Sequence, residues 1–394
     1  MSKTKLFIDV SPLVDPHPSG IAHSIAGLVG ELSKISKNRQ YEVVLLVPRK
    51  NAERLKRWPD LARLKQKKYP FRTRVLNLLN KYNLLPPMDI FFGRGVYLFG
   101  NFKNWPLTGF SRSLTFVHDI CFALFPEFVQ PKNQRMLIEQ VPKYIKRTNK
   151  IITVSETSKK EITDYYRIPG MSVGVVYNGV DTALYKKHSQ KLIDTLKKKI
   201  GVAGKYFIFL GNIEPRKNLN VLIDAFNELP MGLKDTTSLV IIGSDGWLND
   251  NVLKAIDVAK KNGVNVVRPS GYIEDEEVSI LLAGSVALVQ PSFHEGFSMP
   301  PVEALAAGTQ VIASKIPVHQ EILGDKAQYF NPSSKRELSR LLEGALSGSV
   351  QKELDSSFLD RYSWSNSAEI LFEYIDEVKE LRKIKYVISK EGKL

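Results

Sequence analysis

Short apolar strands alternate with helical segments along this chain, and the alternation starts twice. The first series opens with a strand at residues 5–10, a loop and a helix at 21–33, and the second opens with a strand from Tyr206. Chains in which strands and helices alternate form parallel sheets with helices on both faces. Further strands are predicted at 41–47, 95–99, 113–117, 150–154, 238–243, 265–269 and 286–290, and helices at 219–229, 250–261 and 275–283. The pattern predicts the α/β class, with two doubly wound, Rossmann-like domains.

The length of the chain also predicts two domains. Its 394 residues exceed the roughly 250–300 residues at which a single hydrophobic core stops growing. A polar, lysine-rich stretch at 178–204 separates the two series, and we expect a hinge near 181–187. The predicted parts are a first domain at 1–185, a linker at 186–204, a second domain at 205–365 and a C-terminal helix at 366–394. We expect the two domains to face each other across a cleft and the last helix to cross back to the first domain.

The composition excludes several classes of protein. With 43% hydrophobic and 25% charged residues it is that of a globular protein, and no run of about 18 apolar residues could span a bilayer. The apolar run near the start ends at Val10 and Pro12, which is too short for a signal peptide. Cys121 is the one cysteine, so no intramolecular disulfide can form, which suits a reducing compartment. We expect a cytoplasmic protein that lies peripherally on the inner face of a membrane.

The positive charge is concentrated in one segment. The net charge is +15, and twelve Lys or Arg residues lie between 49 and 81 against two acids, Glu53 and Asp60. Apolar side chains are interleaved with these charges, namely Leu61, Leu64, Tyr69, Phe71, Val75, Leu76, Leu78 and Leu79. This basic segment, residues 49–82, predicts contact with an anionic membrane surface; the alternative is a solvated face. Nucleic acid is not expected as a partner, because no zinc-finger spacing, RNP-like motif or basic zipper accompanies the charge.

Two glutamates eight residues apart mark a candidate ligand site in the second half. Glu295 lies in HEGFSMPPVEALA, directly after the strand predicted at 286–290. Glu303 is expected in the first turn of a helix that Pro300 and Pro301 begin and Gly308 ends. Ligands of open α/β sheets bind at the carboxyl ends of the strands, so the two acids predict a hydroxyl-rich ligand. For Glu303 the alternative is a favourable interaction with the helix dipole and no ligand.

A pair of cations follows another strand of the second half. Arg216 and Lys217 lie in GNIEPRKN, residues 211–218, between the strand that begins at Tyr206 and a predicted helix. A guanidinium and an ammonium group side by side bind phosphates well. Cations at the start of a helix oppose its dipole unless an anion binds there. The loop therefore predicts a diphosphate site, with a surface ion pair as the alternative.

The first half carries weaker signals at equivalent places. Gly20 lies in the loop PHPSGIAHS, between the first strand and the first helix, where it would let the backbone approach a phosphate. His118 and Asp119 follow the strand at 113–117. A single histidine at such a place is more often structural than functional. His118 is a candidate ligand residue because the neighbouring strand ends also carry candidate ligand residues.

Taken together, these motifs resemble the retaining, GT-B-fold glycosyltransferases of family 4. The motifs are PSGIAHS at 18, VHD at 117, TVSETSK at 153, NGVD at 178, GNIEPRKN at 211, GYIEDEE at 271 and HEGFSMPPVEALAAGTQVIAS at 294. The resemblance covers nearly the whole chain. It implies that the first domain binds an acceptor and the second a nucleotide-diphosphate sugar.

The resemblance also assigns roles to single residues. Arg216 and Lys217 would hold the diphosphate, which Gly20 would contact from the other domain. The remaining donor residues would be Asn212 in the diphosphate loop, Tyr272 and Ile273 at the base, Glu295 at a sugar hydroxyl, the backbone of Gly296, Phe297, Ser298 and Met299 at the sugar and distal phosphate, and Glu303 at the ribose. His118 would bind the transferred sugar, which makes His118, Arg216, Lys217 and Glu295 the expected catalytic set. Ser298 and Met299 stand where the family commonly has glycine and leucine.

The expected reaction is transfer of a hexose with retention, first of all mannose from GDP-mannose, to a lipid-linked or polysaccharide acceptor. Negative charge that develops on the leaving diphosphate would be stabilised by Arg216 and Lys217. Neither a metal nor another cofactor is expected, since the six histidines are scattered. The alternatives are a UDP- or dTDP-sugar with a soluble acceptor, and a non-catalytic nucleotide- or nucleic-acid-binding protein. Glu295 and Glu303 could also form the acid pair of a retaining hydrolase, about 5 Å apart.

Overall fold

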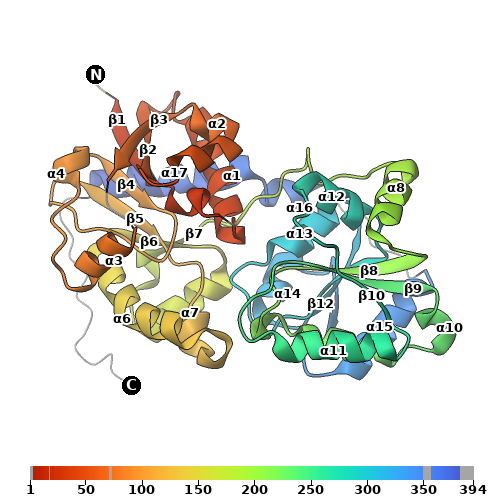
Figure 1. Cartoon of the computed structure of the whole chain (residues 1–394). Coiled ribbons are helices and arrows are strands. Elements are labelled where there is room, and N and C mark those ends of the chain that lie inside the picture. The colour runs from red at the N-terminus through yellow and green to blue at the C-terminus, as the bar shows by residue number, and fades with distance from the viewer. Residues whose placement is uncertain (1–2, 17, 71–72, 349–355, 382–394) are drawn as a thin grey trace. The chain divides into compact units, whose positions relative to one another are not determined.

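The computed structural model divides the chain into two compact units, each with one parallel sheet (Figure 1). It describes residues 3–16, 18–70, 73–348 and 356–381. Unit 1 comprises Met1–Gly179 together with the chain from Tyr362, and unit 2 comprises Val180–Arg361. The predicted fold class, α/β with two doubly wound sheets, is confirmed.

Unit 1 is built on a seven-stranded sheet in the order β3-β2-β1-β4-β5-β6-β7. The strands are β1 (Thr4–Asp9), β2 (Tyr41–Pro48), β3 (Lys65–Tyr69), β4 (Val96–Phe99), β5 (Arg112–Phe116), β6 (Lys150–Thr153) and β7 (Val173–Val175). The helices are η1 (Ser11–Val14), α1 (Gly20–Ile35), η2 (Ala52–Arg57), α2 (Pro59–Ala62), α3 (Thr73–Lys81), α4 (Asp89–Phe92), α5 (Cys121–Leu124), η3 (Pro126–Phe128), α6 (Pro131–Arg147), α7 (Glu156–Tyr166) and η4 (Gly170–Ser172). The central strands are buried along most of their length, as expected for a parallel sheet covered on both faces.

The basic segment is folded into unit 1 and not simply laid along its surface. Its residues Lys65–Tyr69 form β3, an edge strand that pairs with β2. Tyr69 and Leu76 lie in the core cluster that also contains Phe7 and Trp105. This strand was not predicted, because KQKKY lacks an apolar pattern, although lysines are common on edge strands. Phe71 and Arg72, within the predicted membrane segment, lie outside the described residues.

Unit 2 is built on a six-stranded sheet in the order β10-β9-β8-β11-β12-β13. The strands are β8 (Lys205–Leu210), β9 (Thr237–Ile242), β10 (Asn265–Val267), β11 (Ala287–Gln290), β12 (Gln310–Ser314) and β13 (Gln328–Phe330). The helices are α8 (Gln190–Ile200), η5 (Pro215–Lys217), α9 (Leu219–Asn227), α10 (Met231–Lys234), α11 (Asp250–Lys261), α12 (Asp275–Gly284), α13 (Met299–Ala306), α14 (Pro317–Leu323), α15 (Lys335–Leu346) and α16 (Ser356–Arg361). Because β11 pairs with β8, the loops that follow these two strands leave the sheet side by side.

Unit 2 begins earlier than the predicted second domain. The stretch predicted as a linker, 186–204, contains α8, whose Ile193 and Leu196 are buried. A Cβ atom on Gly284 of α12 would lie 2.4 Å from Ile193, which shows how closely these helices pack. His188 also makes a hydrogen bond of 2.8 Å to Ser279 of α12. Because the stretch is rich in lysine, its amphipathic helix was not predicted, although it belongs to the second unit.

The C-terminal helix α17 (Trp364–Glu380) belongs to unit 1, as predicted (Figure 1). Its first residue, Trp364, packs so closely on α1 that a Cβ atom on Gly27 would lie 2.3 Å from the indole ring. Near its other end, Glu377 forms an ion pair of 2.6 Å with Lys150 of β6. The end of the predicted tail, from residue 382, lies outside the described residues.

Candidate active site

Two loops of unit 2 meet at the carboxyl ends of the neighbouring strands β8 and β11. We call residues 211–218 the cation loop and residues 291–298 the acid loop. Asn218, whose φ of 53° is left-handed, donates hydrogen bonds from its side chain to the carbonyls of Pro291 and Pro332. The amide of Phe293 donates to the carbonyl of Arg216 over 2.9 Å. These bonds fix the two loops against each other.

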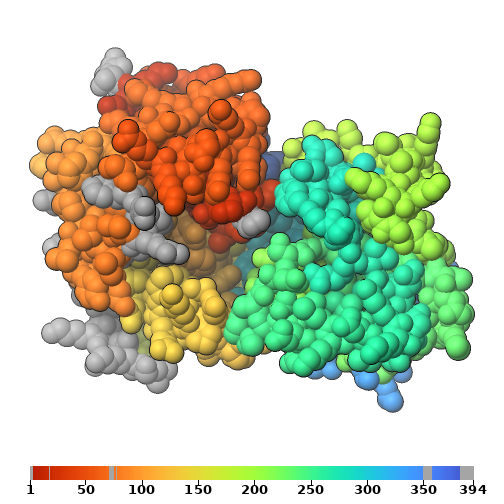
Figure 2. Space-filling view, viewed as in Figure 1, coloured from red at the N-terminus to blue at the C-terminus, as the bar shows by residue number. Residues whose placement is uncertain are grey.

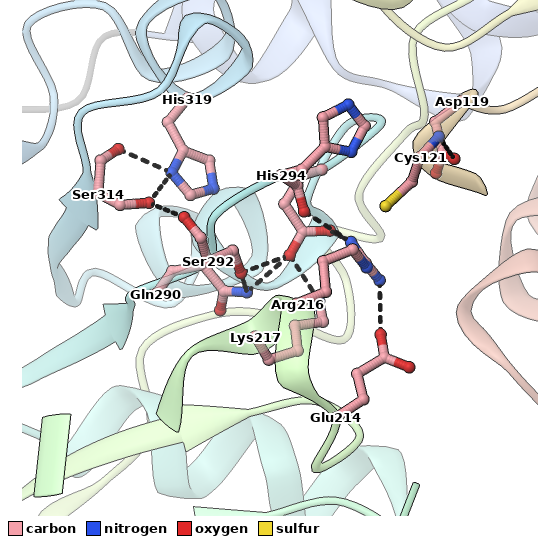
Figure 3. Close-up of polar contacts among 11 residues, drawn as sticks. Asp119, Cys121, Glu214, Arg216, Lys217, Gln290, Ser292, His294, Ser314 and His319 are labelled. Carbon is pink, nitrogen blue, oxygen red and sulfur yellow. Dashed lines mark hydrogen bonds and ion pairs between the residues drawn. The ribbon is translucent and has the colours of Figure 1, made fainter. Parts of the chain in front are cut away.

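Glu295 of the acid loop forms ion pairs with both cations, Arg216 and Lys217, which are labelled in Figure 3. Its Oε2 accepts from Arg216 Nη1 over 2.5 Å, and its Oε1 accepts from Lys217 Nζ over 2.7 Å. Arg216 also donates to the His294 carbonyl and, from Nη2, to Glu214 over 2.8 Å. Burial by itself would raise the pKa of the Glu295 carboxyl, but the charges of Arg216 and Lys217, with hydrogen bonds from Lys217 and Ser292, hold it well below the usual value. Glu295 is therefore ionised.

A second layer of buried polar side chains holds Glu295 from behind. Ser292 Oγ donates to Glu295 Oε1 over 2.6 Å, and Gln290 Nε2 approaches the same oxygen at 3.2 Å. Ser314 Oγ in turn donates to the Ser292 carbonyl, and His319 Nδ1 lies 3.0 Å from the Ser314 carbonyl. Gln290, Ser292 and His319 are fully buried. This layer was not predicted, although the polar residues at the end of a buried strand were a signal for it.

Glu303 lies in a different electrostatic environment. The helix α13 begins at Met299, and so Glu303 is not in its first turn, contrary to the prediction. Burial and the negative charge of Asp275 raise the pKa of Glu303 to about 8, against a hydrogen bond with Tyr185 that lowers it. Glu303 is therefore mostly protonated at neutral pH. Because Glu303 lies beyond the first turn of α13, a favourable interaction with the helix dipole does not explain its place in the sequence. The side chain is buried beside Tyr185.

This pair of glutamates does not suit a hydrolase. A retaining hydrolase needs one protonated and one ionised carboxyl, which Glu303 and Glu295 provide. The ionised one must also present a free oxygen to the sugar, but both oxygens of Glu295 are held by Arg216 and Lys217. The arrangement is that of an ion-pair cluster and not of a nucleophile.

The remaining predicted residues of the acid loop lie where the loop enters α13. Gly296 and Phe297 are buried, and Ser298 adopts a left-handed φ of 73° before Met299 begins the helix. A left-handed backbone favours glycine, so the geometry explains why glycine is common at this position in the resembling family. The Ser298 hydroxyl is buried without a hydrogen-bond partner.

Three other predicted donor residues of unit 2 are less constrained. Asn212 is exposed in the cation loop. Tyr272 is 65% exposed, and Ile273 is partly buried in the loop before α12. The structure places them at the carboxyl side of the same sheet, because these loops follow β8 and β10.

In unit 1, His118 and Gly20 follow strands of the first sheet. His118 Nε2 lies 3.0 Å from the Gly100 carbonyl, so this nitrogen carries the proton and Nδ1 is the acceptor. Burial lowers the pKa of His118, which makes the neutral form dominant. The ring stacks on Phe116, with centroids 5.5 Å apart. Gly20 begins α1, and an added Cβ atom would meet nothing within 4 Å.

The described residues contain neither a cluster of candidate metal ligands nor a helix that could cross a membrane. Across 3–16, 18–70, 73–348 and 356–381, no group of three or more His, Cys, Asp or Glu side chains is placed to hold a metal ion. Over the same ranges, none of the helices combines the length and apolar character needed to cross a bilayer.

Comparison with known proteins assigns both units. The model of the Glycosyltransferase Family 4 domain matches residues 18–184, and that of Glycosyl transferases group 1 matches residues 193–358. O-antigen chain mannosyltransferase B of Escherichia coli is 25% identical over 301 residues, which cover 73% of this chain and 77% of that protein. O-antigen chain mannosyltransferase RfbU of Salmonella typhimurium is 27% identical over 265 residues, 67% of this chain and 69% of that protein.

A solved structure shows the same fold. The Anabaena protein HepE, in complex with UDP and glucose, superposes with a TM-score of 0.71 at 16% identity, over 95% of this chain and 100% of that one. The two family models, the two parallel sheets and the motifs at the ends of β8 and β11 agree with one another. The chain belongs to the group 1, family 4 glycosyltransferases of the GT-B fold.

Proposed function

We propose that this glycosyltransferase transfers mannose from GDP-mannose, with retention of configuration, to a lipid-linked or polysaccharide acceptor. The observation that carries the proposal is the pair of cations, Arg216 and Lys217, fixed at the carboxyl end of β8 against the acid loop. The mannosyltransferases of O-antigen synthesis among the relatives support mannose as the sugar. A UDP- or dTDP-sugar is the alternative donor.

The donor is expected to bind in unit 2 through its charges and hydroxyls. The diphosphate binds Arg216 and Lys217, and the ribose hydroxyls hydrogen-bond with Glu303, which is 8% exposed. The base contacts the loop with Tyr272 and Ile273. The other donor contacts are Asn212 in the cation loop and the backbone of Gly296, Phe297, Ser298 and Met299 at the sugar and distal phosphate.

Catalysis follows from the charge that develops during transfer. As the bond from the anomeric carbon to the phosphate breaks, negative charge grows on the diphosphate, which Arg216 and Lys217 stabilise without a metal. His118 offers its unprotonated Nδ1 to a hydroxyl of the transferred sugar, since Nε2 already donates to Gly100. The acceptor hydroxyl then attacks the same face of the sugar that the diphosphate leaves.

The basic segment supports an acceptor at an anionic membrane surface. On α3, Val75 and Leu78 are 43% and 57% exposed, and Tyr82, which follows the helix, is 62% exposed. The spacing of these three residues by three and four positions puts them on one side of the helix, whereas Leu76 packs into the core. Residues of the basic segment, orange in Figure 2, form part of the surface of unit 1 in that view. A cytoplasmic enzyme bound peripherally to a membrane fits this surface.

Binding and transfer assays with purified protein test the donor site. GDP, UDP and dTDP are titrated by calorimetry, and transfer from the corresponding sugars is measured with and without EDTA. We expect GDP to bind most tightly and transfer to survive EDTA. R216A and K217A should each lower the transfer rate about a hundredfold, with circular dichroism like that of the wild type. Unchanged diphosphate affinity in both variants contradicts the proposed site.

Flotation with liposomes tests the membrane surface. Vesicles with about 30% anionic lipid should carry the protein upward, and neutral vesicles should not. The double variant V75S/L78S should lose most of this binding, whereas L192S, which removes an equally exposed leucine from unit 2, should keep it. Absence of flotation of the wild type would favour the soluble acceptor, and equal flotation of both variants would exclude Val75 and Leu78 as the membrane contact. Strongly salt-dependent binding to nucleic acid without donor turnover would favour the non-catalytic alternative.

A further inference from the structure

The proposed donor site lies at the point where the strand order of the unit 2 sheet reverses. In this sheet β9 and β10 lie on one side of β8, and β11 and the later strands lie on the other. Ligands of open α/β sheets bind at such a reversal, outside the carboxyl ends of the strands. The cation loop follows β8 and the acid loop follows β11, so both loops leave the sheet at the reversal.

The sheet of unit 1 reverses its strand order between β1 and β4. Here β2 and β3 lie on one side of β1, and β4 and the later strands lie on the other. The strand β1 ends at Asp9, and the loop after β4, residues 100–105, carries Lys103. Lys103 Nζ lies 3.8 Å from Asp9 Oδ2. A carboxylate and an ammonium group therefore face each other at the reversal in unit 1, where the fold predicts a ligand.

Lys103 stands on a fixed loop, and its ammonium group has unused hydrogen-bond donors. The next residue, Asn104, is buried and donates from its side chain to the Thr115 hydroxyl and the Tyr144 carbonyl. The separation of 3.8 Å from Asp9 is too long for a hydrogen bond. Within the described part of the chain, the structure records no other contact of this ammonium group with an acceptor. The Lys103 side chain is 19% exposed, so a ligand can reach it.

Asp9 is buried and can act on a ligand only through Lys103. It is 1% exposed. Its carboxylate accepts from the amide of Ser11 over 3.2 Å and from the Ser11 hydroxyl over 3.0 Å. These two hydrogen bonds fix the carboxylate, and its charge then attracts Lys103.

Asp15 adds an exposed carboxylate from the loop after β1. Burial raises the pKa of Asp15, and the charges of Lys103 and Arg54 oppose that rise. Asp9 and Asp15 thus balance Lys103 and Arg54, so this point carries no net charge. A phosphate gains little from such a neutral set of charges. The hydroxyls of a sugar fit it better, because they can accept from the ammonium group and donate to the carboxylate.

The loop that carries Lys103 also orients His118. The Gly100 carbonyl accepts from His118 Nε2 over 3.0 Å, and the Phe102 ring packs edge-on against the imidazole, with centroids 5.7 Å apart. His118 is the residue proposed for the transferred sugar. A second sugar held by Lys103 would therefore be bound by the same loop, as the acceptor in a transfer reaction requires.

We propose that Lys103 and Asp15 bind hydroxyl groups of the acceptor sugar, and that Asp9 is a positioning residue that holds Lys103 for this contact. The inference rests on the proposed function, because it assumes an acceptor that presents a sugar. It assigns to unit 1 a site that recognises a neutral sugar and not the phosphate of a lipid-linked acceptor.

Binding of methyl α-mannoside to the full chain tests the site, measured by saturation-transfer NMR in the presence of saturating GDP. K103M and D15N should each weaken sugar binding about tenfold, because each loses a hydrogen bond to a charged group. Their affinity for GDP should remain that of the wild type. K103R keeps the charge and should retain most of the sugar binding. K65M, which removes an ion-paired lysine at the amino end of β3, is the matched control and should bind the sugar like the wild type.

A double-variant cycle tests the role of Asp9. D9N alone should weaken sugar binding, but D9N/K103M should bind the sugar no more weakly than K103M does. Losses that add would mean that Asp9 supports the fold and does not act through Lys103. Should D9N fail to fold, the comparison of K103M with K103R still tests the contact with the sugar.

Three results would overturn the proposal. The first is a wild type that does not bind the sugar, and the second is binding by K103M and D15N that equals that of the wild type. The third is displacement of the sugar by inorganic phosphate, which would show that the site recognises an anion. If R216A and K217A keep their diphosphate affinity, the proposed function itself fails. If they lose it and K103M has no effect on sugar binding, only the acceptor site fails.

Discussion

Replacing Glu303 with glutamine should stabilise the chain at alkaline pH and not at acid pH. Burial and the charge of Asp275 raise the pKa of Glu303 from 4.5 to about 8 in the folded protein. The folded state therefore binds the proton more tightly than the unfolded chain does. The stability that this proton provides is complete below about pH 4.5, and it is lost as the pH rises through 8.

The size of the effect follows from the two pKa values. Each pKa unit corresponds to about 1.4 kcal/mol, so ionisation of Glu303 removes about 4 kcal/mol of unfolding free energy between about pH 5 and pH 8.5. Glutamine has the same shape and no charge, so E303Q escapes this loss. The free energy of unfolding of E303Q minus that of the wild type should rise by at most this amount over the range.

Urea unfolding at a series of pH values, followed by circular dichroism, measures this difference. Other groups titrate in the same range, but they do so equally in both proteins and cancel in the difference. E276Q, which changes an exposed glutamate of the same unit, is the control for the substitution itself. If the E303Q difference is constant from about pH 5 to pH 8.5, Glu303 is not protonated in the folded protein and the reasoning is refuted.

Two further predictions concern packing and the neighbour of Glu303. G27A should lower the stability of unit 1 by about 1–3 kcal/mol, because its Cβ atom would lie 2.3 Å from Trp364. The control G30A, on the same helix, places its Cβ atom where nothing lies within 4 Å and should stabilise the helix slightly. Equal thermal unfolding midpoints for the two variants would show that Trp364 moves freely. Y185F should raise the pKa of Glu303 further, because the hydrogen bond from Tyr185 lowers it; in urea unfolding the pH-dependent loss of stability should then shift to higher pH, and an unshifted profile means that this bond is not formed.

The sequence predicted the elements of the fold well because most of them carry strong local signals. The predicted helix at 250–261 coincides with α11, and the strand at 150–154 differs from β6 by one residue. The failures have local causes as well. The edge strand β3 consists of KQKKY and has no apolar pattern, and α8 was read as a linker because lysines outnumber its buried Ile193 and Leu196.

The sequence predicted which residues of the site follow the strands, but it did not predict how these residues contact one another. The sequence places Arg216 after one strand and Glu295 after another, but their contact depends on β11 pairing with β8, a neighbour relation across 80 residues. The ion pairs that occupy both oxygens of Glu295 follow from that pairing and from side-chain geometry. The protonation of Glu303 depends on Asp275 and Tyr185, which lie on other elements. No local pattern contains this information.

The opposite protonation of the two glutamates leads to a last prediction, that donor binding releases a proton. At pH 7 a carboxyl with a pKa of about 8 is mostly protonated, but ribose hydroxyls donate best to a carboxylate. Binding of GDP should therefore drive Glu303 toward its ionised form, with release of nearly one proton at about pH 7 and none at about pH 9.5. Calorimetry of GDP binding in phosphate and in Tris buffer measures the release, because the buffers differ in ionisation enthalpy. Since E303Q has no proton to release, its binding enthalpy should be the same in both. Equal enthalpies for the wild type at about pH 7 would mean that the ribose does not ionise Glu303.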